Sequence, residues 1–455
     1  MDSPASRTCG IAAGRLNLAE YAANFSDAHP PLNRPQALIE AERCYYCYDA
    51  PCTTACPTSI DVPAFIARIA QDNVRGAARE ILTANPLGGM CSRVCPTEQL
   101  CEEACVRNTN EDKPVEIGAL QRYATDAFMA AGGAPLFQRA AATGKKVAVV
   151  GAGPAGLTCA HQLALQGHDV VLLDARPKLG GLNEYGLASY KTPNDFAQKE
   201  IDWLLSVGGI TPHNNQRLGR DFTLDSLLAS YDAVFLGMGL GGVNALGIAE
   251  PQAEGLRNAV DFIADIRQAS DKATVPVGRR VVVIGGGMTA VDAAVQAKLL
   301  GAEEVTMFYR RGKDALSASG VEQEWAQTHG VNLRLWAAPQ QVLVQDGKVT
   351  GIRMAYTQLQ DGKLQVGPEV FDVPADMVLK AIGQTYVSAH AGNAIALRDG
   401  RIDTDAEGQT SVSRVWAGGD CRAGGQDLTV EAVEHGKVAA RAMHQALTSA
   451  VGAGV

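Results

Sequence analysis

Residues 145–156 read KKVAVVGAGPAG, and residues 279–290 read RRVVVIGGGMTA. Each stretch is a short, mostly β-branched run that ends on glycine and is followed by small residues and an apolar helical pattern. This order is typical of a buried parallel strand that leads into the helix of a βαβ unit. Two such openings in one chain predict an α/β protein with two Rossmann-like nucleotide-binding domains.

The first glycine motif has the sequence context that a dinucleotide site requires. Gly151, Gly153 and Gly156 follow the predicted strand, and Asp174 comes directly after the next predicted strand at 169–173. The glycines permit a tight turn and the close approach of a pyrophosphate to the start of a helix. We therefore expect Asp174 to accept a hydrogen bond from a ribose hydroxyl.

The second glycine motif ends in alanine and lacks the acidic residue. The position that reads the ribose is Tyr309, and Arg310 and Arg311 follow it. Two cations there suit a 2′-phosphate better than a free hydroxyl, so electrostatics favours NADPH, although the pair could also be a solvated turn. The candidate nicotinamide-nucleotide contacts are Gly285, Gly287, Thr289, Ala290, Arg310 and Arg311.

A third nucleotide-related segment lies near the C-terminus. Gly419 and Asp420 follow a predicted strand and precede a helix that begins near Thr429. Small residues let the backbone approach a ligand, and a carboxylate binds a polyol. We expect Asp420 to hold the ribityl chain of FAD, and the helix at Thr429 to direct its positive end at the flavin ring.

Eight of the 11 cysteines fall in two blocks before the first Rossmann motif. The blocks read Cys44-x2-Cys47-x4-Cys52-x3-Cys56-Pro57 and Cys91-x3-Cys95-Pro96-x4-Cys101-x3-Cys105. Thiolates at these spacings, with proline directly after a cysteine, follow the logic of bacterial ferredoxins and predict two iron–sulfur clusters. The alternative is a pair of structural zinc sites, which also take four thiolates.

The ligands can be divided between the two predicted clusters. If Cys56 crosses to the second cluster, as the fourth ferredoxin cysteine does, Cys105 is the natural fourth ligand of the first cluster. The second cluster then lacks one ligand, and two residues compete for it: Cys91 and Gln121, which lies on the apolar stripe of the helix predicted after the blocks. The first set is Cys44, Cys47, Cys52 and Cys105, and the second contains Cys56, Cys95 and Cys101.

Composition and charge exclude several classes of protein. The 455 residues are 46% hydrophobic and 20% charged, which is the composition of a globular chain of several domains and not of a disordered one. A net charge of −9 disfavours nucleic acid as a partner, because the phosphate backbone is repelled on average. No apolar run reaches the length of a signal peptide or a membrane span, so we expect a soluble cytoplasmic protein.

Several sequence strings resemble one flavoprotein family. They are residues 42–44 (ERC), 49–52 (DAPC), 93–98 (RVCPTE) and 117–122 (IGALQR). The family includes the small subunit of bacterial glutamate synthase and the N-terminal half of dihydropyrimidine dehydrogenase. The interval Cys95-x5-Cys101 and the presence of Gln121, where the glutamate synthase type has a Glu-rich helix, place this chain on the pyrimidine branch.

The resemblance implies a domain order and further contacts. It implies an α-helical domain with two [4Fe-4S] clusters at 1–143, an FAD domain in two segments at 144–258 and 376–455, and an NAD(P) domain inserted between them at 259–375. It also implies that Gly181 and Leu182 contact the flavin. In this branch a glutamine is the fourth ligand of the second cluster and aligns with Gln121, which leaves Cys91 outside the ligand set.

The resemblance implies an electron-entry subunit of bacterial dihydropyrimidine dehydrogenase. NAD(P)H would reduce FAD, and the clusters would pass electrons to a partner subunit with FMN and iron–sulfur centres, which reduces uracil or thymine at its 5,6 double bond. The cofactors carry the chemistry, so no side chain is assigned as catalytic. The alternatives are a glutamate synthase-type subunit with another acceptor, a disulfide reductase, which would need a cysteine pair near the flavin, and a zinc-binding scaffold.

Overall fold

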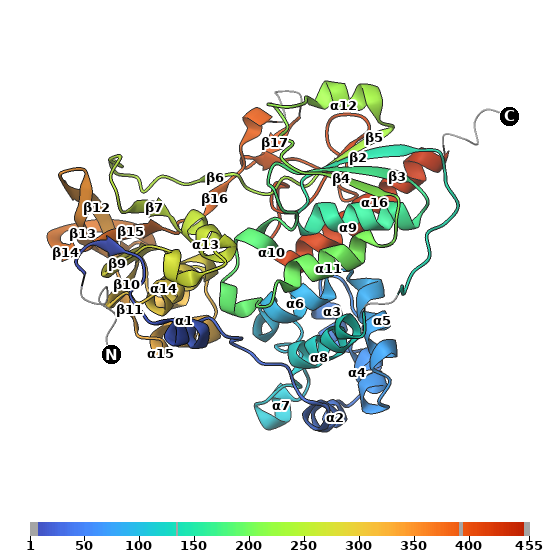
Figure 1. Cartoon of the computed structure of the whole chain (residues 1–455), viewed down its shortest axis with the longest axis horizontal. Coiled ribbons are helices and arrows are strands. Elements are labelled where there is room, and N and C mark those ends of the chain that lie inside the picture. Colours follow the sequence, from blue (N-terminus) through green and yellow to red (C-terminus); the bar gives the residue numbers. More distant parts are fainter. Residues whose placement is uncertain (1–7, 133–134, 391–394, 450–455) are drawn as a thin grey trace. The chain divides into compact units, whose positions relative to one another are not determined.

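The computed structural model describes residues 8–132, 135–390 and 395–449 (Figure 1). The chain divides into two compact units, each built from separate segments. The first unit comprises Met1–Ala28, Tyr185–Pro193 and Gly242–Gln384, and the second comprises His29–Glu184, Asn194–Gly241 and Thr385–Val455. Among the helices within these described ranges, none combines the length and the apolar character needed to cross a lipid bilayer.

The cysteine blocks of the second unit lie in a small helical domain, as expected. Its core consists of apolar side chains such as Phe65, Ile69 and Leu120, which are fully buried. The apolar helical spacing of residues 62–81 predicts one helix, but the structure has two, because Asp72 adopts a left-handed φ of 59° and Asn73 caps a new helix. The helices are α2 (Arg34–Glu42), α3 (Pro51–Ala55), α4 (Val62–Ala70), α5 (Val74–Ala84), α6 (Gly88–Val94), α7 (Asn108–Glu111) and α8 (Ile117–Ala130).

The rest of the second unit is a doubly wound nucleotide-binding domain. Its five-stranded parallel sheet has the order β19-β5-β2-β3-β4, and Val147 of β2 pairs with Val170 of β3. The strand β19 comes from the C-terminal part of the chain, so this sheet is assembled from two segments, as the fold prediction requires. The elements are β2 (Lys146–Val150), α9 (Pro154–Leu165), β3 (Asp169–Leu173), α11 (Phe196–Leu205), β4 (Ile210–His213), α12 (Leu224–Ser230), β5 (Ala233–Leu236), β17 (Leu397–Arg398), β18 (Arg401–Ile402), β19 (Val415–Ala417) and α16 (Thr429–Ser449).

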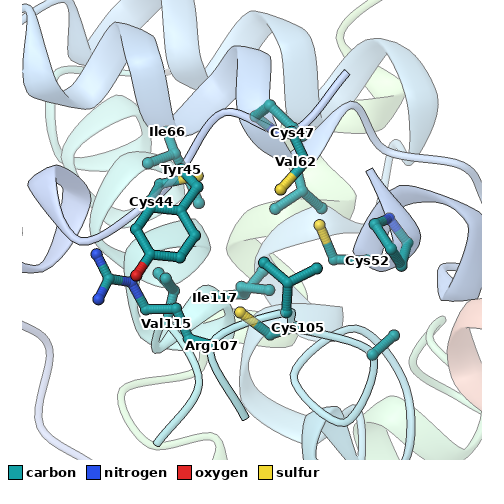
Figure 2. Close-up of a pocket in the computed structure, with 14 residues that line it drawn as sticks. Cys44, Tyr45, Cys47, Cys52, Val62, Ile66, Cys105, Arg107, Val115 and Ile117 are labelled. Atoms are coloured by element: carbon teal, nitrogen blue, oxygen red, sulfur yellow. The ribbon is translucent and has the colours of Figure 1, made fainter. Parts of the chain in front are cut away.

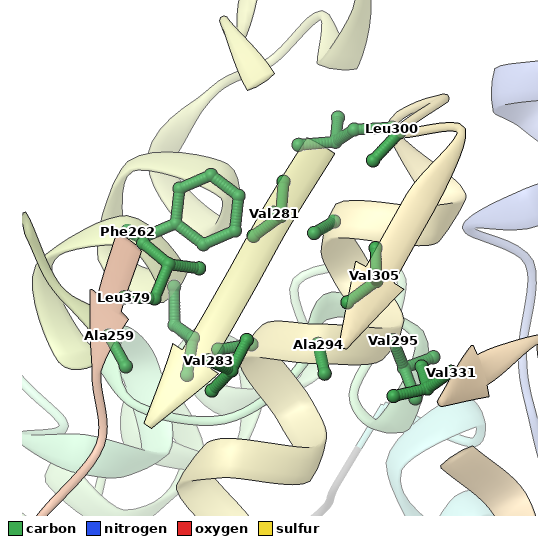
Figure 3. Close-up of a cluster of buried hydrophobic side chains, with 14 of the residues drawn as sticks. Ala259, Phe262, Val281, Val283, Ala294, Val295, Leu300, Val305, Val331 and Leu379 are labelled. Carbon is green, nitrogen blue, oxygen red and sulfur yellow. The ribbon is translucent and has the colours of Figure 1, made fainter. Parts of the chain in front are cut away.

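The first unit contains the second Rossmann-like sheet, in the order β11-β10-β9-β15-β7. Figure 3 shows its apolar core, in which Val281, Val305 and Phe262 are buried between the strands and the adjoining helices. The elements are β7 (Leu256–Asn258), α13 (Ala259–Gln268), β8 (Val277–Gly278), β9 (Arg280–Ile284), α14 (Met288–Leu299), β10 (Glu304–Tyr309), α15 (Gly320–Thr328), β11 (Val331–Leu335) and β15 (Met377–Lys380).

The limits of the first unit differ from the domain limits expected at 259 and 375. The strands β7 and β15 lie outside that range, and both pair within the same sheet, because Val378 is in register with Leu256 and Val282. Between β11 and β15 the chain forms an antiparallel sheet that the sequence did not predict. Its strands are β12 (Ala337–Gln345), β13 (Lys348–Gln360) and β14 (Lys363–Pro374).

The N-terminal segment belongs to the first unit and not to the helical domain. The strand β1 (Ile11–Ala12) pairs with β8, and the helix α1 (Leu18–Asn24) follows it. Arg15 is 1% exposed, and its Nε donates to the carbonyl oxygen of Val277 at 3.0 Å. A buried guanidinium requires acceptors, and this one lies 262 residues away in the sequence, which explains why composition assigned the segment to the cysteine-rich part.

Candidate cofactor sites

Four cysteines line one pocket of the helical domain. Cys44, Cys47, Cys52 and Cys105 surround it, and Figure 2 shows the four side chains around the same space. Its apolar wall comes from Val62, Ile66, Val115 and Ile117. The pocket therefore contains the four residues predicted for the first cluster, including Cys105 from the second block.

The environment of these thiols is suited to a bound metal cation. Burial, together with the neighbouring sulfurs, raises the pKa of Cys44 and raises the pKa of Cys52 to about 11. Metal ligation requires thiolates, and bound iron would supply the positive charge that this cluster of thiols lacks. In the part of the chain that the structure describes, no three His, Cys, Asp or Glu side chains converge on one metal ion. A cubane instead needs thiols spread around its corners.

The other four cysteines form a second group. A hydrogen bond with the Cys91 thiol, followed by burial, raises the pKa of Cys95, and the charges of Cys101 and Cys56 add to the effect. Burial raises the pKa of Cys101 far above its usual range, and Cys56 contributes. The structure thus brings Cys56, Cys95 and Cys101 together, with Cys91 beside Cys95. Their assignment as ligands of one cluster stays a prediction.

Gln121 lies on α8 and is 7% exposed. Its Nε2 atom donates to the carbonyl oxygen of Gly88, at the first residue of α6, over 2.6 Å. Cys91 lies one turn further along the same helix. Both candidates for the last ligand position therefore belong to α6 and α8, which pack against each other. In Gln121 the Nε2 atom has a hydrogen-bond partner, and the Oε1 atom is available to a ligand.

The glycine loop at 151–156 is tightly packed at Gly151 and Gly156 and has open space beside Gly153. Gly151 has a φ of 93°, and a Cβ on Gly156 would lie 1.8 Å from the carbonyl oxygen of Gly151. A Cβ on Gly153 would meet only the Cα atom of Gly181, at 3.8 Å. The open side at the N-terminus of α9 is where a pyrophosphate would approach.

Asp174 connects this loop to the chain after β3 through hydrogen bonds to backbone amides. Its Oδ2 accepts from the Ala152 amide at 2.7 Å, and its Oδ1 accepts from the Arg176 amide at 2.8 Å. Burial raises the pKa of Asp174. Each carboxylate oxygen keeps a further lone pair, so the side chain can stabilise the loop and still accept from a ribose hydroxyl.

The C-terminal segment lies against the same loop. A Cβ on Gly419 would meet the Cβ of Ala155 at 3.1 Å, and Gly419 itself has a φ of 73°. Thr429 Oγ1 donates to Asn183 Oδ1 at 2.9 Å, which joins the start of α16 to the short helix α10 (Leu182–Tyr185). The structure therefore gathers the predicted flavin contacts of three distant segments, around Gly153, Gly181 and Gly419.

Sequence reasoning missed His435, which lies on α16. Its Nδ1 accepts from the Gly419 amide at 3.2 Å, and burial lowers the pKa of His435 to about 4. The imidazole is therefore neutral at physiological pH and holds the loop that carries Asp420. A single histidine within a helical pattern gives no signal for this role, because its partner is a backbone amide 16 residues away.

Replacing Asp420 by asparagine should have opposite effects on stability and on flavin retention. Burial, with smaller contributions from Asp427 and Glu431, raises the pKa of Asp420 from 3.8 to about 6. An acid with a raised folded pKa loses stability as pH rises from its unfolded to its folded value, here from about 4 to about 6, by at most about 3 kcal/mol. We expect apo Asp420→Asn to melt higher than wild type at pH 7.5 and equally at pH 4, while FAD retention falls.

The measurement is thermal unfolding of the apo-protein at both pH values, together with flavin stoichiometry of the purified holoprotein. Flavin content equal to that of wild type would remove Asp420 from the flavin site. A melting temperature unchanged at pH 7.5 would contradict the burial cost.

The second glycine motif forms the turn between β9 and α14. A Cβ on Gly285 would lie 2.2 Å from the Ala381 carbonyl oxygen, and one on Gly287 would lie 3.0 Å from Ser317 Oγ. Thr289 is half-buried and Ala290 is buried, both in the first turn of α14. Ser317 is a further polar group at this turn that the motif alone does not reveal.

Arg310 and Arg311 follow β10 directly and are both exposed. Their carbonyl oxygens accept from Thr357 Oγ1 and from the Trp336 amide, which fixes the backbone. Within the described ranges, neither guanidinium has an ion-pair partner. Two such cations directly after β10 occupy the position at which residues that bind a 2′-phosphate are expected.

Replacing both arginines by alanine should therefore change coenzyme preference. A charge-assisted hydrogen bond contributes about 1.5–3 kcal/mol, so we expect the KM for NADPH to rise by at least about 10-fold and that for NADH to stay nearly constant. Steady-state reduction of a dye with each coenzyme measures this. Arg334→Ala, an exposed arginine on the neighbouring strand β11, is the matched control. Equal changes with both coenzymes would contradict a phosphate-reading role.

Comparison with known proteins agrees with both parts of this description. A family described as dihydropyrimidine dehydrogenase domain II, 4Fe-4S cluster, matches residues 21–133. A family described as pyridine nucleotide-disulphide oxidoreductase matches residues 145–436, which is more than half of the chain. The chain belongs to the pyridine nucleotide-disulphide oxidoreductase family.

Relatives within this family cover almost the whole chain. The NAD-dependent dihydropyrimidine dehydrogenase subunit PreT of Escherichia coli (strain K12) is 36% identical over 91% of this chain and 95% of the relative. The glutamate synthase [NADPH] small chain of the same organism is 34% identical over 91% of this chain and 92% of the relative. The predicted family resemblance is therefore confirmed.

A solved structure shares the fold. Mycobacterium tuberculosis FprA in complex with NADPH has a TM-score of 0.57 at 18% identity, and the match covers 68% of this chain and 86% of that chain. The predicted α/β class with an N-terminal iron–sulfur domain is confirmed. The chain is an electron-transfer NAD(P)H oxidoreductase with FAD and iron–sulfur domains.

The family name includes disulphide chemistry, for which the position of the remaining cysteines matters. Cys159 is buried beside Met443, with 3.9 Å between the two sulfurs. Cys421 is buried and its thiol donates to the carbonyl oxygens of Gly418 and Leu236. Each thiol thus has its own packed partner in the core, as expected for cysteines without a redox role.

Proposed function

We propose that this chain is the electron-entry subunit of a dihydropyrimidine dehydrogenase. It takes electrons from NAD(P)H and passes them through two [4Fe-4S] clusters to a partner subunit with FMN and iron–sulfur centres, which reduces uracil or thymine to the 5,6-dihydro form. The observation that carries the proposal is the buried Gln121 beside α6, at the position where the glutamate synthase type is expected to have a Glu-rich helix.

The proposal includes the ligand sets. Cys44, Cys47, Cys52 and Cys105 would hold the first cluster, and Cys56, Cys95, Cys101 and Gln121 the second. The thiol donors, their burial and their grouping in two sets fit these clusters. The glycine loop at 151–156, with Asp174, Gly181, Leu182, Gly419, Asp420 and Thr429, would hold FAD, which when bound accepts a hydride and releases electrons singly.

Contacts within the second unit favour an order for the two clusters. Lys437 of α16 donates to the carbonyl oxygen of Thr58 at 3.1 Å, and Thr58 Oγ1 lies 3.3 Å from Cys56 Sγ. The second set of ligands therefore adjoins the helix that borders the flavin loop. Near the first set, Tyr48 is fully exposed and Tyr45 is about half exposed. We infer that electrons enter at the second cluster and leave at the first.

The decisive experiment combines the purified holoprotein with a candidate FMN subunit. NADH or NADPH, uracil and both subunits should give dihydrouracil, and omission of either subunit should abolish it. A parallel reaction supplies glutamine and 2-oxoglutarate with a glutamate synthase large subunit. Dihydrouracil formation supports the proposal, and glutamate formation alone would replace it.

A glutamate synthase-type subunit is the second candidate, because the small chain from Escherichia coli is almost as similar as the PreT subunit. The same pair of reactions distinguishes the two. Metal analysis that found zinc and no iron would instead support a scaffold and overturn both.

A further inference from the structure

One peptide group in the helical domain is hydrogen-bonded on both of its sides. It joins Gly88 to Gly89 at the start of α6. Its N–H donates to Glu200 Oε1 at 2.7 Å, and its carbonyl oxygen accepts from Gln121 Nε2 at 2.6 Å. The next amide, that of Met90, also donates to the Glu200 carboxyl, at 3.2 Å. Glu200 and Gln121 are thus connected through a single peptide plane.

Glu200 comes from the nucleotide-binding part of the second unit, on α11, and is 0% exposed. Burying a carboxyl group is costly unless its oxygens are bonded and charge is balanced nearby. The two backbone amides provide the bonds. Arg93 is close by: its guanidinium lies 3.4 Å from the centre of the Phe196 ring and is paired with Asp126. Burial raises the pKa of Glu200 to about 8, while the Gly89 and Met90 amides and the charge of Arg93 act in the opposite direction.

Glycine is required at both ends of the shared peptide. A Cβ on Gly89 would lie 2.6 Å from Phe196 Cζ and 2.7 Å from Glu200 Oε1. A Cβ on Gly88 would lie 2.5 Å from Ile81 Cγ2. The two glycines therefore leave room for the α11 side chains Phe196 and Glu200 beside Gly89 and for Ile81 of α5 beside Gly88.

We propose that Glu200 is a positioning residue for Gln121. A carbonyl oxygen only accepts hydrogen bonds, so the amide atom that faces Gly88 must be the NH2 group, and Oε1 is left free to bind metal. The bond from Gly89 to Glu200 polarises the peptide and makes the Gly88 oxygen a stronger acceptor. Glu200 thereby holds the amide in the orientation that presents its oxygen. The inference rests on the proposed role of Gln121 as a cluster ligand.

The test uses the holoprotein alone, without a partner subunit. Four variants are compared with wild type: Glu200→Ala, Glu200→Gln, Gln121→Leu and Asp202→Ala. The readouts are iron content, the EPR spectrum after reduction and the midpoint potential of each cluster. Asp202 is exposed on the same helix α11 and serves as the matched control.

We expect Glu200→Ala to shift the second-cluster signal and potential in the same direction as Gln121→Leu, with the first-cluster signal unchanged. Glu200→Gln should restore the wild-type spectrum, because its amide oxygen still accepts from Gly89. Asp202→Ala should match wild type. The double variant Glu200→Ala/Gln121→Leu should equal Gln121→Leu, because no ligand is left to position.

The outcomes separate this inference from the proposed function. A second cluster altered in Gln121→Leu and unaltered in Glu200→Ala overturns the positioning role alone. Wild-type spectra in Gln121→Leu overturn the ligand assignment and the inference together. If Glu200→Ala loses both clusters, the variant Glu200→Asp replaces it, because its carboxyl oxygens lie one methylene further from the Gly89 amide. A folded Glu200→Asp protein with a wild-type second-cluster signal overturns the inference.

Discussion

Cys105→Ala should remove one cluster and leave the other in place. Cys105 belongs to the second cysteine block, yet it lines the same pocket as Cys44, Cys47 and Cys52. Without its thiolate the first cluster lacks one corner ligand, so we expect iron content to fall by about half and electron transfer to a one-electron acceptor by at least about 100-fold. Reduction of the flavin by NAD(P)H should persist, because the nucleotide sites do not include this residue.

Iron analysis, EPR and stopped-flow reduction of the flavin measure the three effects. Cys9→Ser is the control, because Cys9 is an exposed cysteine outside both blocks. If Cys105→Ala lost the same signal as Cys95→Ala, the two cysteines would share a cluster and the division of ligands would be wrong. Wild-type iron content would remove Cys105 from the ligand sets.

Gly153→Ala should weaken flavin binding without unfolding the protein. Gly153 has a φ of −75°, which any L-residue adopts, and its added Cβ would meet no atom closer than 3.8 Å. Neither the backbone conformation nor packing therefore requires glycine at position 153, and we attribute it to the close approach of the flavin pyrophosphate. We expect flavin affinity to fall by at least about 10-fold and the melting temperature of the apo-protein to stay constant or rise slightly.

Two other glycine variants serve as controls for Gly153→Ala. Gly156→Ala places a Cβ 1.8 Å from the Gly151 carbonyl oxygen and should prevent the loop from folding. Gly320→Ala meets nothing within 4 Å and should match wild type in flavin content. Flavin titration and thermal melts compare the three. Normal flavin affinity in Gly153→Ala would show that the pyrophosphate does not approach this residue.

The two Rossmann-like sheets were predictable because their signals are local. A buried parallel strand requires an apolar, mostly β-branched run, and the turn that follows requires glycine, so both features appear together at 145–156 and at 279–290. The break between α4 and α5 was not predicted, since the apolar spacing continues across Asp72. The antiparallel sheet at 337–374 also gave no clear signal, because many of its side chains are exposed.

The amino-acid sequence by itself determined the class of fold, the nucleotide loops and the kind of cluster ligand, because each depends on residues within a few positions of one another. Only the tertiary structure decided that residues 8–28 belong to the first unit, and that Glu200 reaches Gln121 through the Gly88–Gly89 peptide. These contacts join residues far apart in the chain, and no spacing or periodicity records which distant backbone group a buried side chain will meet.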